Sequence, residues 1–409
     1  MLYLYNTGII LFGLVARLVA PFNTRAALIT KGRARVWDQL AGSDLRGQVV
    51  WVHCASLGEF EQGRPLIEAI KREHPNYKIV LTFFSPSGYE VRKNYDQVDV
   101  VVYLPADTRK NAQRFIRAVH PDKVYFVKYE YWFHYFSQLK RANIPLYSVS
   151  SIFRKEQIFF RWNGAWFRNM LKCVTRFYVQ DEQSARLLTS IDIDNHVVAG
   201  DTRFDRVAAI AAKAVEVPVI ADFAQGAQVI VAGSSWPEDE AILADFINNS
   251  PAQVRCIVAP HEVHESHVTQ LAGRFKVPVC RYSKLSGPIP ADARVLVIDT
   301  IGLLSSIYRY GSVAYIGGGF GKGIHNTLEA ATYGMPVIFG PNHTKFKEAV
   351  DLIQHGAGFP ISDKAGFMKV MEMFWSPNAE TALKASGAAA LSYVQSMCGA
   401  TSRILKETF

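Results

Sequence analysis

Short, nearly continuous apolar runs alternate with amphipathic segments along the whole chain. Such runs are typical of strands in parallel sheets that helices cover on both faces. Between them, segments such as Phe60–Glu73 and Lys110–Val119 carry apolar residues at helical spacing. The sequence therefore predicts an α/β fold with strands at Val49–Cys54, Lys78–Phe84, Val98–Leu104, Lys123–Val127, Leu146–Ser150, Arg176–Val179 and His196–Ala199, and then at Val229–Ala232, Val254–Ala259, Val295–Ile298, Val313–Ile316 and Pro336–Phe339.

The two series of strands are separated by the alanine- and charge-rich stretch Asp201–Phe223. We expect a membrane-associated segment over residues 1–35, one doubly wound domain over residues 36–200 and a second over residues 201–409. In open parallel sheets, ligands bind beyond the carboxyl ends of the strands. The loops that follow the strands are therefore the places to look for a site.

Composition narrows the class of protein. With 49% hydrophobic and only 20% charged residues, the chain is not disordered. Its five cysteines are scattered without a CxxC pair, which argues against a disulfide scaffold or zinc ribbon and fits a reducing compartment. Residues 1–200 hold 27 Lys and Arg against 17 Asp and Glu, whereas residues 201–409 hold 18 against 19. The basic first half suits an anionic surface or a phosphorylated ligand.

The first segment, Leu2–Phe22, is mostly apolar and long enough, at about 30 Å as a helix, to enter a bilayer. Arg17 argues against a simple membrane span, and no basic stretch precedes the segment as in a secretory signal. Basic residues follow it, at Arg25, Lys31, Arg33 and Arg35. We expect a helix that lies on or in a membrane and keeps the rest of the chain cytoplasmic; an ordinary buried first helix is the alternative.

Two acidic residues follow strands of the first half. Glu59 comes after Val49–Cys54, in a stretch where Ser56 and Gly58 suit a tight turn, and would open the next helix. A carboxylate there can simply favour the helix dipole, or it can act as a general base. Glu130 follows Lys123–Val127, within the segment Lys128–Trp132, as either a second site carboxylate or a solvated residue in an aromatic cluster. His53 and Cys54 are no catalytic pair, because neighbours on a strand face opposite sides.

A glycine-rich loop, Gly317–Gly323, follows the strand Val313–Ile316 and leads toward a predicted helix. Backbone N–H groups at a helix N-terminus can hold a phosphate. The loop lacks the ending of a nucleotide-hydrolysing P-loop, and Glu329, one turn after Asn326, could bind a ribose. The alternative is a glycine turn with a structural role.

Three more loops end strands of the second half. Gly233, Ser234 and Ser235 would cap a helix in any protein and could also face a phosphate or sugar. Pro260–His267 is rich in histidine but lacks HExxH spacing, so a loop that contacts a base or phosphate is favoured over a metal site. Asp299–Gly302 is the third loop.

In combination, these motifs resemble those of the transferases that attach 3-deoxy-D-manno-octulosonic acid (Kdo) to lipid A precursors. The resemblance runs over essentially the whole chain: the apolar N-terminus, Ala55–Glu59, Glu130–Trp132, Gly200–Asp205, Ala259–Pro260, Asp299–Gly302 and Gly323–Glu329. It implies a GT-B fold with two Rossmann-like domains facing a cleft. It also implies CMP-Kdo as donor, a lipid A precursor as acceptor, and inverting transfer without a metal or cofactor.

By this resemblance, Glu59 is the catalytic base and Glu130 a second essential acid. The residues expected at the donor are Ser56, Gly58, Gly233, Ser234, Ser235, Pro260, His261, Ile301, Gly302, Gly319, Gly323, His325, Asn326 and Glu329. The chain departs from the family pattern at His261, where an arginine is usual, at Leu303, where a glutamate is common, and at Lys128 and Phe133.

The expected location is the cytoplasmic face of the inner membrane, and nucleic acid is not an expected partner. A GT-B transferase that uses a UDP-sugar and a non-catalytic nucleotide-sugar binding protein are the alternatives.

Overall fold

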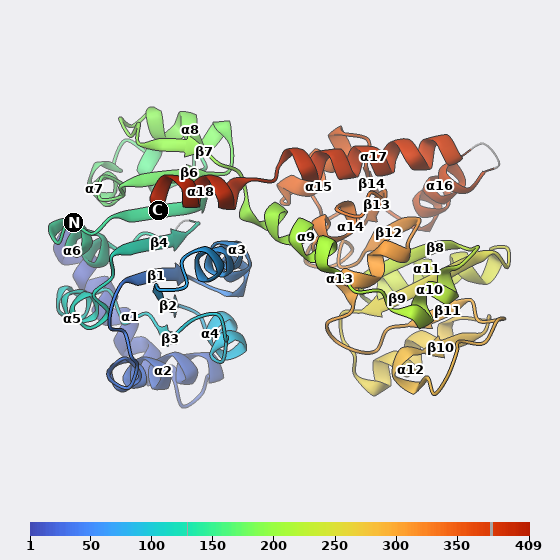
Figure 1. The fold of residues 1–409 in the computed structure, drawn as a ribbon, viewed down its shortest axis with the longest axis horizontal. Coiled ribbons are helices and arrows are strands. Elements are labelled where there is room, and N and C mark those ends of the chain that lie inside the picture. Colours follow the sequence, from blue (N-terminus) through green and yellow to red (C-terminus); the bar gives the residue numbers. More distant parts are fainter. Residues whose placement is uncertain (129, 377–378) are drawn as a thin grey trace. The chain divides into compact units, whose positions relative to one another are not determined.

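The computed structural model describes residues 1–128, 130–376 and 379–409, so Tyr129 of the predicted Lys128–Trp132 segment lies outside the described residues. The chain forms two compact units (Figure 1). The first comprises Met1–Arg206 with Cys398–Phe409, and the second comprises Val207–Met397.

The first unit is built on a seven-stranded parallel sheet of order β3-β2-β1-β4-β5-β6-β7. Its strands are β1 Val49–Cys54, β2 Lys78–Phe83, β3 Val100–Tyr103, β4 Lys123–Val127, β5 Leu146–Ser151, β6 Arg176–Val179 and β7 His196–Val198. Its helices are α1 Leu2–Val19, α2 Thr24–Ala41, α3 Leu57–Glu73, α4 Pro86–Arg92, α5 Arg109–Val119, α6 Phe133–Arg141, α7 Ala165–Leu171, α8 Glu182–Thr189 and α18 Ala400–Thr408.

The second unit has its own seven-stranded parallel sheet, of order β10-β11-β9-β8-β12-β13-β14. Its strands are β8 Gln228–Ser235, β9 Val254–Pro260, β10 Val279–Arg281, β11 Val295–Val297, β12 Val313–Ile316, β13 Val337–Phe339 and β14 Gly358–Pro360. Its helices are α10 Pro218–Ala224, α11 Pro237–Asn249, α12 Glu265–Arg274, α13 Leu304–Ile307, α14 Leu328–Ala331, α15 Lys347–Gln354, α16 Lys364–Trp375 and α17 Glu380–Ser396; α9, Thr202–Lys213, runs from the first unit into the second.

These sheets confirm the predicted α/β class. The sequence did not predict β10 and β14, which are the two edge strands of the second sheet and only three residues long. Strand β10 reads Val-Cys-Arg and β14 reads Gly-Phe-Pro, so neither shows the apolar run that marks the other strands.

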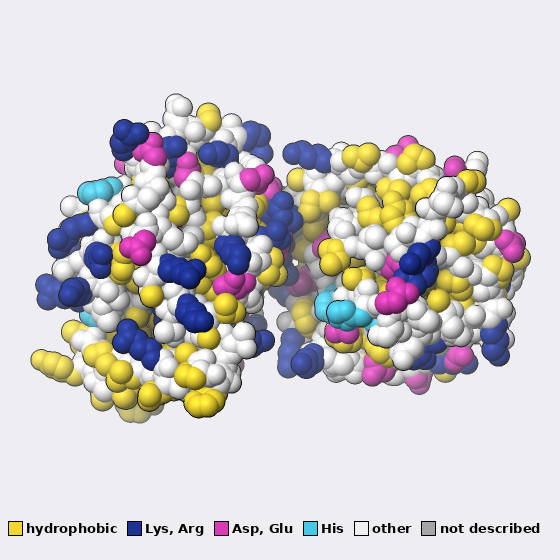
Figure 2. All heavy atoms as spheres, turned by 90° about the horizontal axis from the view of Figure 1, so that it is seen from below, with side chains coloured by type: hydrophobic (Ala, Val, Ile, Leu, Met, Phe, Trp, Pro, Cys, Tyr) yellow, Lys and Arg dark blue, Asp and Glu magenta, His cyan; other side chains and the backbone are white. Residues whose placement is uncertain are grey.

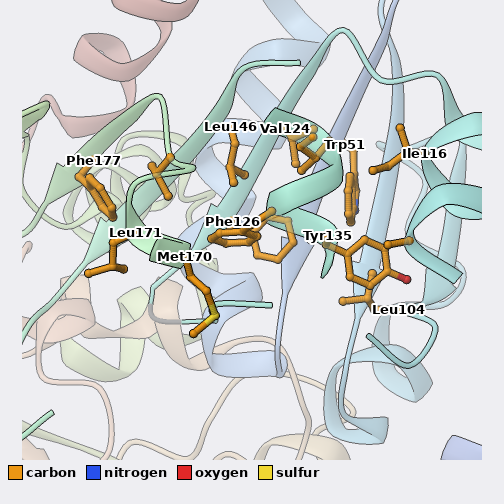
Figure 3. Packing of buried hydrophobic residues seen from close by; sticks show 14 of the residues in the cluster. Trp51, Leu104, Ile116, Val124, Phe126, Tyr135, Leu146, Met170, Leu171 and Phe177 are labelled. Carbon is orange, nitrogen blue, oxygen red and sulfur yellow. The ribbon is translucent and has the colours of Figure 1, made fainter. Parts of the chain in front are cut away.

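Both faces of the first sheet are covered, as its apolar strands require. Along β1, Val49 and Trp51 belong to one buried cluster, whereas Val50, Val52 and Cys54 belong to the cluster on the other face. Trp51 anchors the first cluster, with its ring centroid 4.9 Å from that of Phe115 and 5.3 Å from that of Phe126 (Figure 3). This packing fixes the register of the strand and hence the residues at its carboxyl end.

Helix α1 is long and apolar enough to cross a membrane, and none of its residues is buried. This excludes the alternative of an ordinary buried first helix. Its exposed side chains include Leu11, Leu14, Val15 and Leu18. Figure 2 shows hydrophobic side chains gathered at one edge of the first unit, with Lys and Arg side chains beside them.

The last twelve residues return to the first unit, whereas the sequence predicts one domain over residues 201–409. Ile404 and Leu405 of α18 are buried in the cluster that also holds Val50 and Val52 of β1. The Asp205 carboxylate accepts hydrogen bonds from the backbone N–H groups of Gly399 (2.5 Å) and Thr401 (2.7 Å), at the start of α18. Hydrophobic burial and this cap hold the terminal helix on the first sheet.

Asp205→Ala should lower the free energy of unfolding by about 1–2 kcal/mol, because two N–H groups at the start of α18 lose their acceptor. Urea unfolding followed by circular dichroism would measure it. Asp194→Ala is the matched control, since Asp194 is exposed and its carboxylate makes no hydrogen bond within the described part of the chain. Equal midpoints for the two variants would contradict the capping role.

Candidate active site

In the first unit, the two predicted acids lie at the switch point of the sheet. Strand β1 pairs with β2 on one side and with β4 on the other. Glu59 lies in the first turn of α3, directly after β1, and Glu130 lies between β4 and α6. The carboxyl ends of two parallel neighbours meet at one edge of a sheet, where crevices for ligands form. The topology therefore brings Glu59 and Glu130 to the same edge.

Glu59 is half-buried and paired with Ser56. The Ser56 hydroxyl donates a hydrogen bond to Glu59 Oε2. Ser56 is the N-cap residue of α3 but makes no capping bond to the backbone. Gly58, expected in a tight turn, is the second residue of α3. The Ser56 hydroxyl therefore bonds to Glu59 instead of the helix backbone, and this neutral donor orients the Glu59 carboxylate.

Glu130 is held from two sides. The Trp132 indole Nε1–H donates to Glu130 Oε2 at 2.9 Å, and His53 Nε2 lies 3.6 Å from the same oxygen. The His53 side chain is 0% exposed, whereas that of Glu130 is 23% exposed. Glu130 therefore has a buried side against His53 and an open side toward solvent.

His53 is fixed by a buried hydroxyl. Thr82 Oγ1 lies 2.8 Å from His53 Nδ1 and accepts the indole hydrogen bond of Trp51 at 2.8 Å. The indole can only donate, so the Thr82 hydroxyl keeps its own proton, for which both His53 Nδ1 and Val52 O, at 3.4 Å, are within hydrogen-bond distance. The sequence did not predict that His53 lies against Glu130. Cys54 faces the other side of the sheet, as predicted, with Sγ near Gly63.

The second unit has its own switch point, between β8 and β12. Gly233, Ser234 and Ser235 end β8, and Gly317–Gly319 follow β12 beside it. A Cβ at Gly317 would lie 2.2 Å from the backbone oxygen of Ser234, and one at Gly319 would lie 2.5 Å from the backbone of Gly340. Close backbone packing alone therefore requires these two glycines.

Asp239 holds the glycine loop in place. Its Oδ2 accepts hydrogen bonds from the N–H groups of Gly318 and Trp236, both at 2.9 Å, and its Oδ1 accepts the Tyr315 hydroxyl at 2.7 Å. Burial raises the pKa of Asp239 above its ordinary value. The sequence did not single out Asp239, because a contact with a loop 79 residues away leaves no local signal.

The loop continues into α14, which is a single turn. A dipole of that length contributes little charge stabilisation, so the predicted phosphate-binding helix is weaker than expected. The N–H groups of Gly321 and Gly323 are bonded to Gly318 O, and that of His325 to Gly317 O. In the described part of the chain, the N–H groups of Asn326 and Thr327 have no such acceptor.

Three flat side chains stack beside this loop. The His261 ring lies 4.8 Å from Trp236 and 4.5 Å from His325, centroid to centroid, and the Trp236 indole donates to His325 Nε2 at 3.1 Å. Burial, with a smaller effect of His261, lowers the pKa of His325. A neutral His325 is what that hydrogen bond needs. Trp236 is a further residue that the sequence did not single out.

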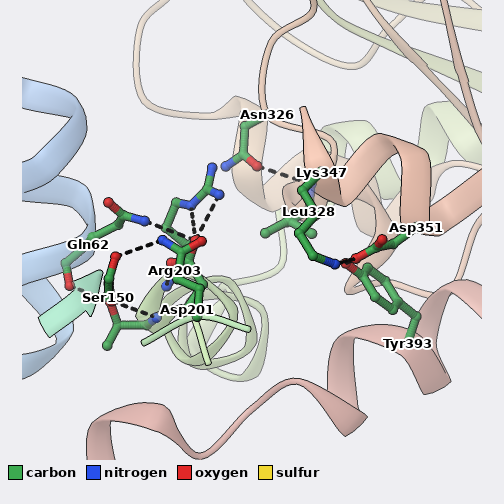
Figure 4. A network of polar contacts seen from close by, with 11 residues as sticks. Gln62, Ser150, Asp201, Arg203, Asn326, Leu328, Lys347, Asp351 and Tyr393 are labelled. Carbon is green, nitrogen blue, oxygen red and sulfur yellow. Dashed lines mark hydrogen bonds and ion pairs between the residues drawn. The ribbon is translucent and has the colours of Figure 1, made fainter. Parts of the chain in front are cut away.

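The remaining predicted residues also lie at strand ends of the second unit. Asn326 Nδ2 donates to Glu329 Oε1 at 3.0 Å. Asn326 Oδ1 accepts the N–H of Leu328 (Figure 4). Pro260 is the buried end of β9, and His261 N–H donates to Ser235 O. Ile301 is 89% exposed, and Gly302 has a φ of 98°. Gly323, with a φ of 142°, is the other loop glycine in the left-handed region that the sequence placed at the donor.

Two histidines of Pro260–His267 have separate partners. His261 joins the stack, whereas His267 Nε2 lies 2.9 Å from Glu240 Oε1. Across residues 1–128, 130–376 and 379–409, no three His, Cys, Asp or Glu side chains are grouped as a metal would need.

The motif Gly200–Asp205, one of those that resemble the Kdo transferases, has a structural role in the first unit. Asp201 Oδ2 accepts hydrogen bonds from Gln62 Nε2 and Arg203 Nε, both at 2.9 Å (Figure 4). Gln62 lies on α3, one turn from Glu59. This network and the Asp205 cap explain the motif without a ligand.

Asp239→Ala should speed hydrogen exchange at the Gly318 amide and lower the free energy of unfolding by about 1–3 kcal/mol, because buried donors lose their acceptor. Exchange followed by mass spectrometry over Gly317–Ile324 would detect it. The neighbouring, exposed Glu238→Ala is the control. Unchanged exchange in Asp239→Ala would contradict the role of the carboxylate in holding the loop.

Comparison with known proteins agrees with this picture. Residues 23–206 match the family model described as "3-Deoxy-D-manno-octulosonic-acid transferase (kdotransferase)". A 3-deoxy-D-manno-octulosonic acid transferase of Rickettsia felis is 24% identical, over 85% of this chain and 76% of that protein. The one of Aquifex aeolicus is 26% identical, over 77% and 82%.

Solved structures share the fold at low identity. A putative UDP-N-acetylglucosamine 2-epimerase of Listeria monocytogenes superposes with a TM-score of 0.59 at 15% identity, over 88% of this chain and 95% of that one. With the two parallel sheets, this likeness identifies the GT-B fold. Residues 23–206 thus match a Kdo transferase domain, and the chain is similar to Kdo transferases, which are glycosyltransferases, over most of its length.

Proposed function

We propose that this protein transfers Kdo from CMP-Kdo to a lipid A precursor, with inversion at the anomeric carbon. The observation that carries the proposal is the pair of carboxylates, Glu59 and Glu130, at the switch point between β1 and β4 in a chain similar to Kdo transferases. Each carboxylate has a partner that orients it.

Glu59 is the proposed general base. Its carboxylate takes the proton of an acceptor hydroxyl while that oxygen attacks C2 of Kdo. The bond from C2 to the CMP phosphate breaks, and its electron pair leaves with the phosphate oxygen. The Ser56 hydroxyl keeps one carboxylate oxygen oriented, which leaves the other for the acceptor. Glu130, fixed by Trp132 and backed by His53, orients the reacting sugars.

The donor site is proposed at the strand ends of the second unit. The unpaired N–H groups of Asn326 and Thr327 would serve the phosphate of CMP, and Glu329 its ribose. The loops at Pro260–His261 and Ile301–Gly302 would hold the rest of the nucleotide. The neighbouring donor contacts are proposed to be Gly233, Ser234, Ser235, Gly319, Gly323 and His325. Ser56 and Gly58, in the first unit, are also proposed to contact the donor. Transfer is proposed to need no metal.

The proposed location is the cytoplasmic face of the inner membrane. The unburied apolar side of α1 and the basic residues that follow it support contact with anionic lipids. A lipid A precursor carries phosphates and acyl chains, so it suits both features.

The proposal is tested by incubating the purified protein with CMP-Kdo and a lipid A precursor. Mass spectrometry should show the acceptor heavier by one or more Kdo residues. Turnover only with a UDP-sugar, or CMP-Kdo binding without any turnover, would replace the proposal by one of its two alternatives.

Glu59→Gln should lower kcat by about 10²–10⁴-fold, the usual contribution of a general base, while the affinity for CMP stays unchanged. Glu73→Gln, at the exposed end of the same helix, is the control. Asn326→Ala, by contrast, should weaken CMP binding, which calorimetry would measure. Near-normal turnover in Glu59→Gln would remove its assignment as base.

Membrane contact is tested on the exposed side of α1. Replacing Leu11, Leu14 and Leu18 by Gln should release the protein from anionic vesicles in a flotation assay, because each buried Leu contributes roughly 1.5–3 kcal/mol. Gln at Val91 and Val215, which are exposed elsewhere, is the control. Flotation equal to wild type would show that α1 is not the anchor.

A further inference from the structure

A cavity of about 270 Å³ lies in the first unit, between α1 and the carboxyl ends of the strands. Helices α1 and α2 supply Ile9, Phe12 and Arg33. The loops after β2, β3 and β4 supply the other walls: Phe84, Leu104, Pro105, Ala106, Asp107 and Trp132. The walls are mostly hydrocarbon and aromatic faces.

The carboxylate in the wall is already satisfied. Asp107 Oδ2 accepts the Tyr5 hydroxyl at 2.5 Å and His134 N–H at 3.0 Å, and Oδ1 accepts Tyr135 N–H at 3.0 Å. These bonds fix the start of α6 and dock α1 on the unit. Apart from Arg33, the lining residues therefore offer no open polar group to a sugar or nucleotide, and the interior suits a hydrocarbon ligand.

Arg33 adds a positive charge to this apolar wall. Its Nε donates to Leu104 O at 3.0 Å, and its guanidinium carbon lies 4.9 Å from the centroid of the Phe84 ring. Within the described part of the chain, no carboxylate lies within ion-pair distance of Arg33. A ligand with a hydrocarbon chain and an anionic group would match the cavity and this cation.

The cavity also connects α1 with the proposed catalytic site. The Phe12 ring stacks on Phe84 at 6.1 Å, and Phe84 stacks on Trp132 at 5.2 Å. Trp132 in turn donates to Glu130. The same indole thus forms a wall of the cavity and holds the carboxylate. At the other end, Ile9 and Phe12 belong to the helix whose outward side is apolar and unburied.

We propose that this cavity binds one acyl chain of the lipid acceptor. The inference rests on the proposed function and assigns its substrate a subsite. A chain that leaves the bilayer along α1 stays in apolar surroundings until it reaches Trp132, and Arg33 pairs with an anionic group of the headgroup. The enzyme thereby selects acylated acceptors over the bare phosphorylated sugar, and Ile9, Phe12 and Ala106 determine that selection.

The test compares two acceptors in detergent: a lipid A precursor, and the same disaccharide phosphate after removal of all its acyl chains, both ester- and amide-linked. The quantity measured is kcat/KM for the acylated acceptor divided by kcat/KM for the deacylated one. Ile9→Trp, from α1, and Ala106→Leu, from the opposite wall, both fill the cavity. Each should lower the ratio about tenfold or more, since two methylenes kept out of an apolar site already cost about that factor.

Val91→Trp adds the same bulk at an exposed position outside the cavity and should keep the wild-type ratio. Thermal unfolding of all variants checks that they are folded. A wild-type ratio near one, or ratios unchanged in both filling variants, would overturn the acyl subsite while leaving Kdo transfer intact. Transfer to neither acceptor by the wild type would instead overturn the proposed function.

Discussion

In each unit, one central strand lies between two parallel neighbours, and the chain leaves it in opposite directions to reach them. The candidate site depends on this pairing. Strand β1 lies between β2 and β4, and β8 lies between β9 and β12. The helices after β1 and β4 must cover opposite faces of the sheet, so their first turns separate at the strand ends and leave a crevice. Glu59 and Glu130 lie at one such crevice, and the glycine loop lies at the other.

Much of this could be predicted because the signals are local. A strand such as Val49–Cys54 is apolar apart from His53, and burial on both faces favours that pattern. Glu59 could be located because it opens the helix after such a strand, and Asn326 because it follows the glycine-rich loop after another strand. The roles of these residues came from resemblance, and they stay proposals that the geometry suits.

What the sequence did not reveal depends on contacts between distant segments. Asp239 contacts Gly318, Trp236 contacts His325, and His53 contacts Thr82, and none of these pairs is close in sequence. The prediction for the glycine loop was also incomplete. Gly317 and Gly319 are required by backbone packing, and the helix after the loop is only one turn long. The polar Asn6 in an apolar segment is explained by a partner 128 residues away, His134 Nε2 at 2.7 Å.

The docking of α1 changes what kind of membrane contact is feasible. Tyr5 and Asn6 tie this helix to Asp107 and His134, so its orientation is that of the unit. A helix bonded along one side to a folded domain presents its other side to lipid, which favours a helix that lies in the interface over an independent span.

The return of α18 to the first sheet has a consequence for synthesis on the ribosome. The second unit, residues 207–397, is complete before the last twelve residues emerge. At ribosomal rates of roughly 5–20 residues per second, the first unit waits on the order of 10–40 s for its final helix. During that time, the patch on β1, β2 and α3 that Ile404 and Leu405 will cover stays open to solvent. The part of the chain made first is therefore the last to be finished, and a nascent chain stalled near residue 397 exposes apolar surface that the released protein hides.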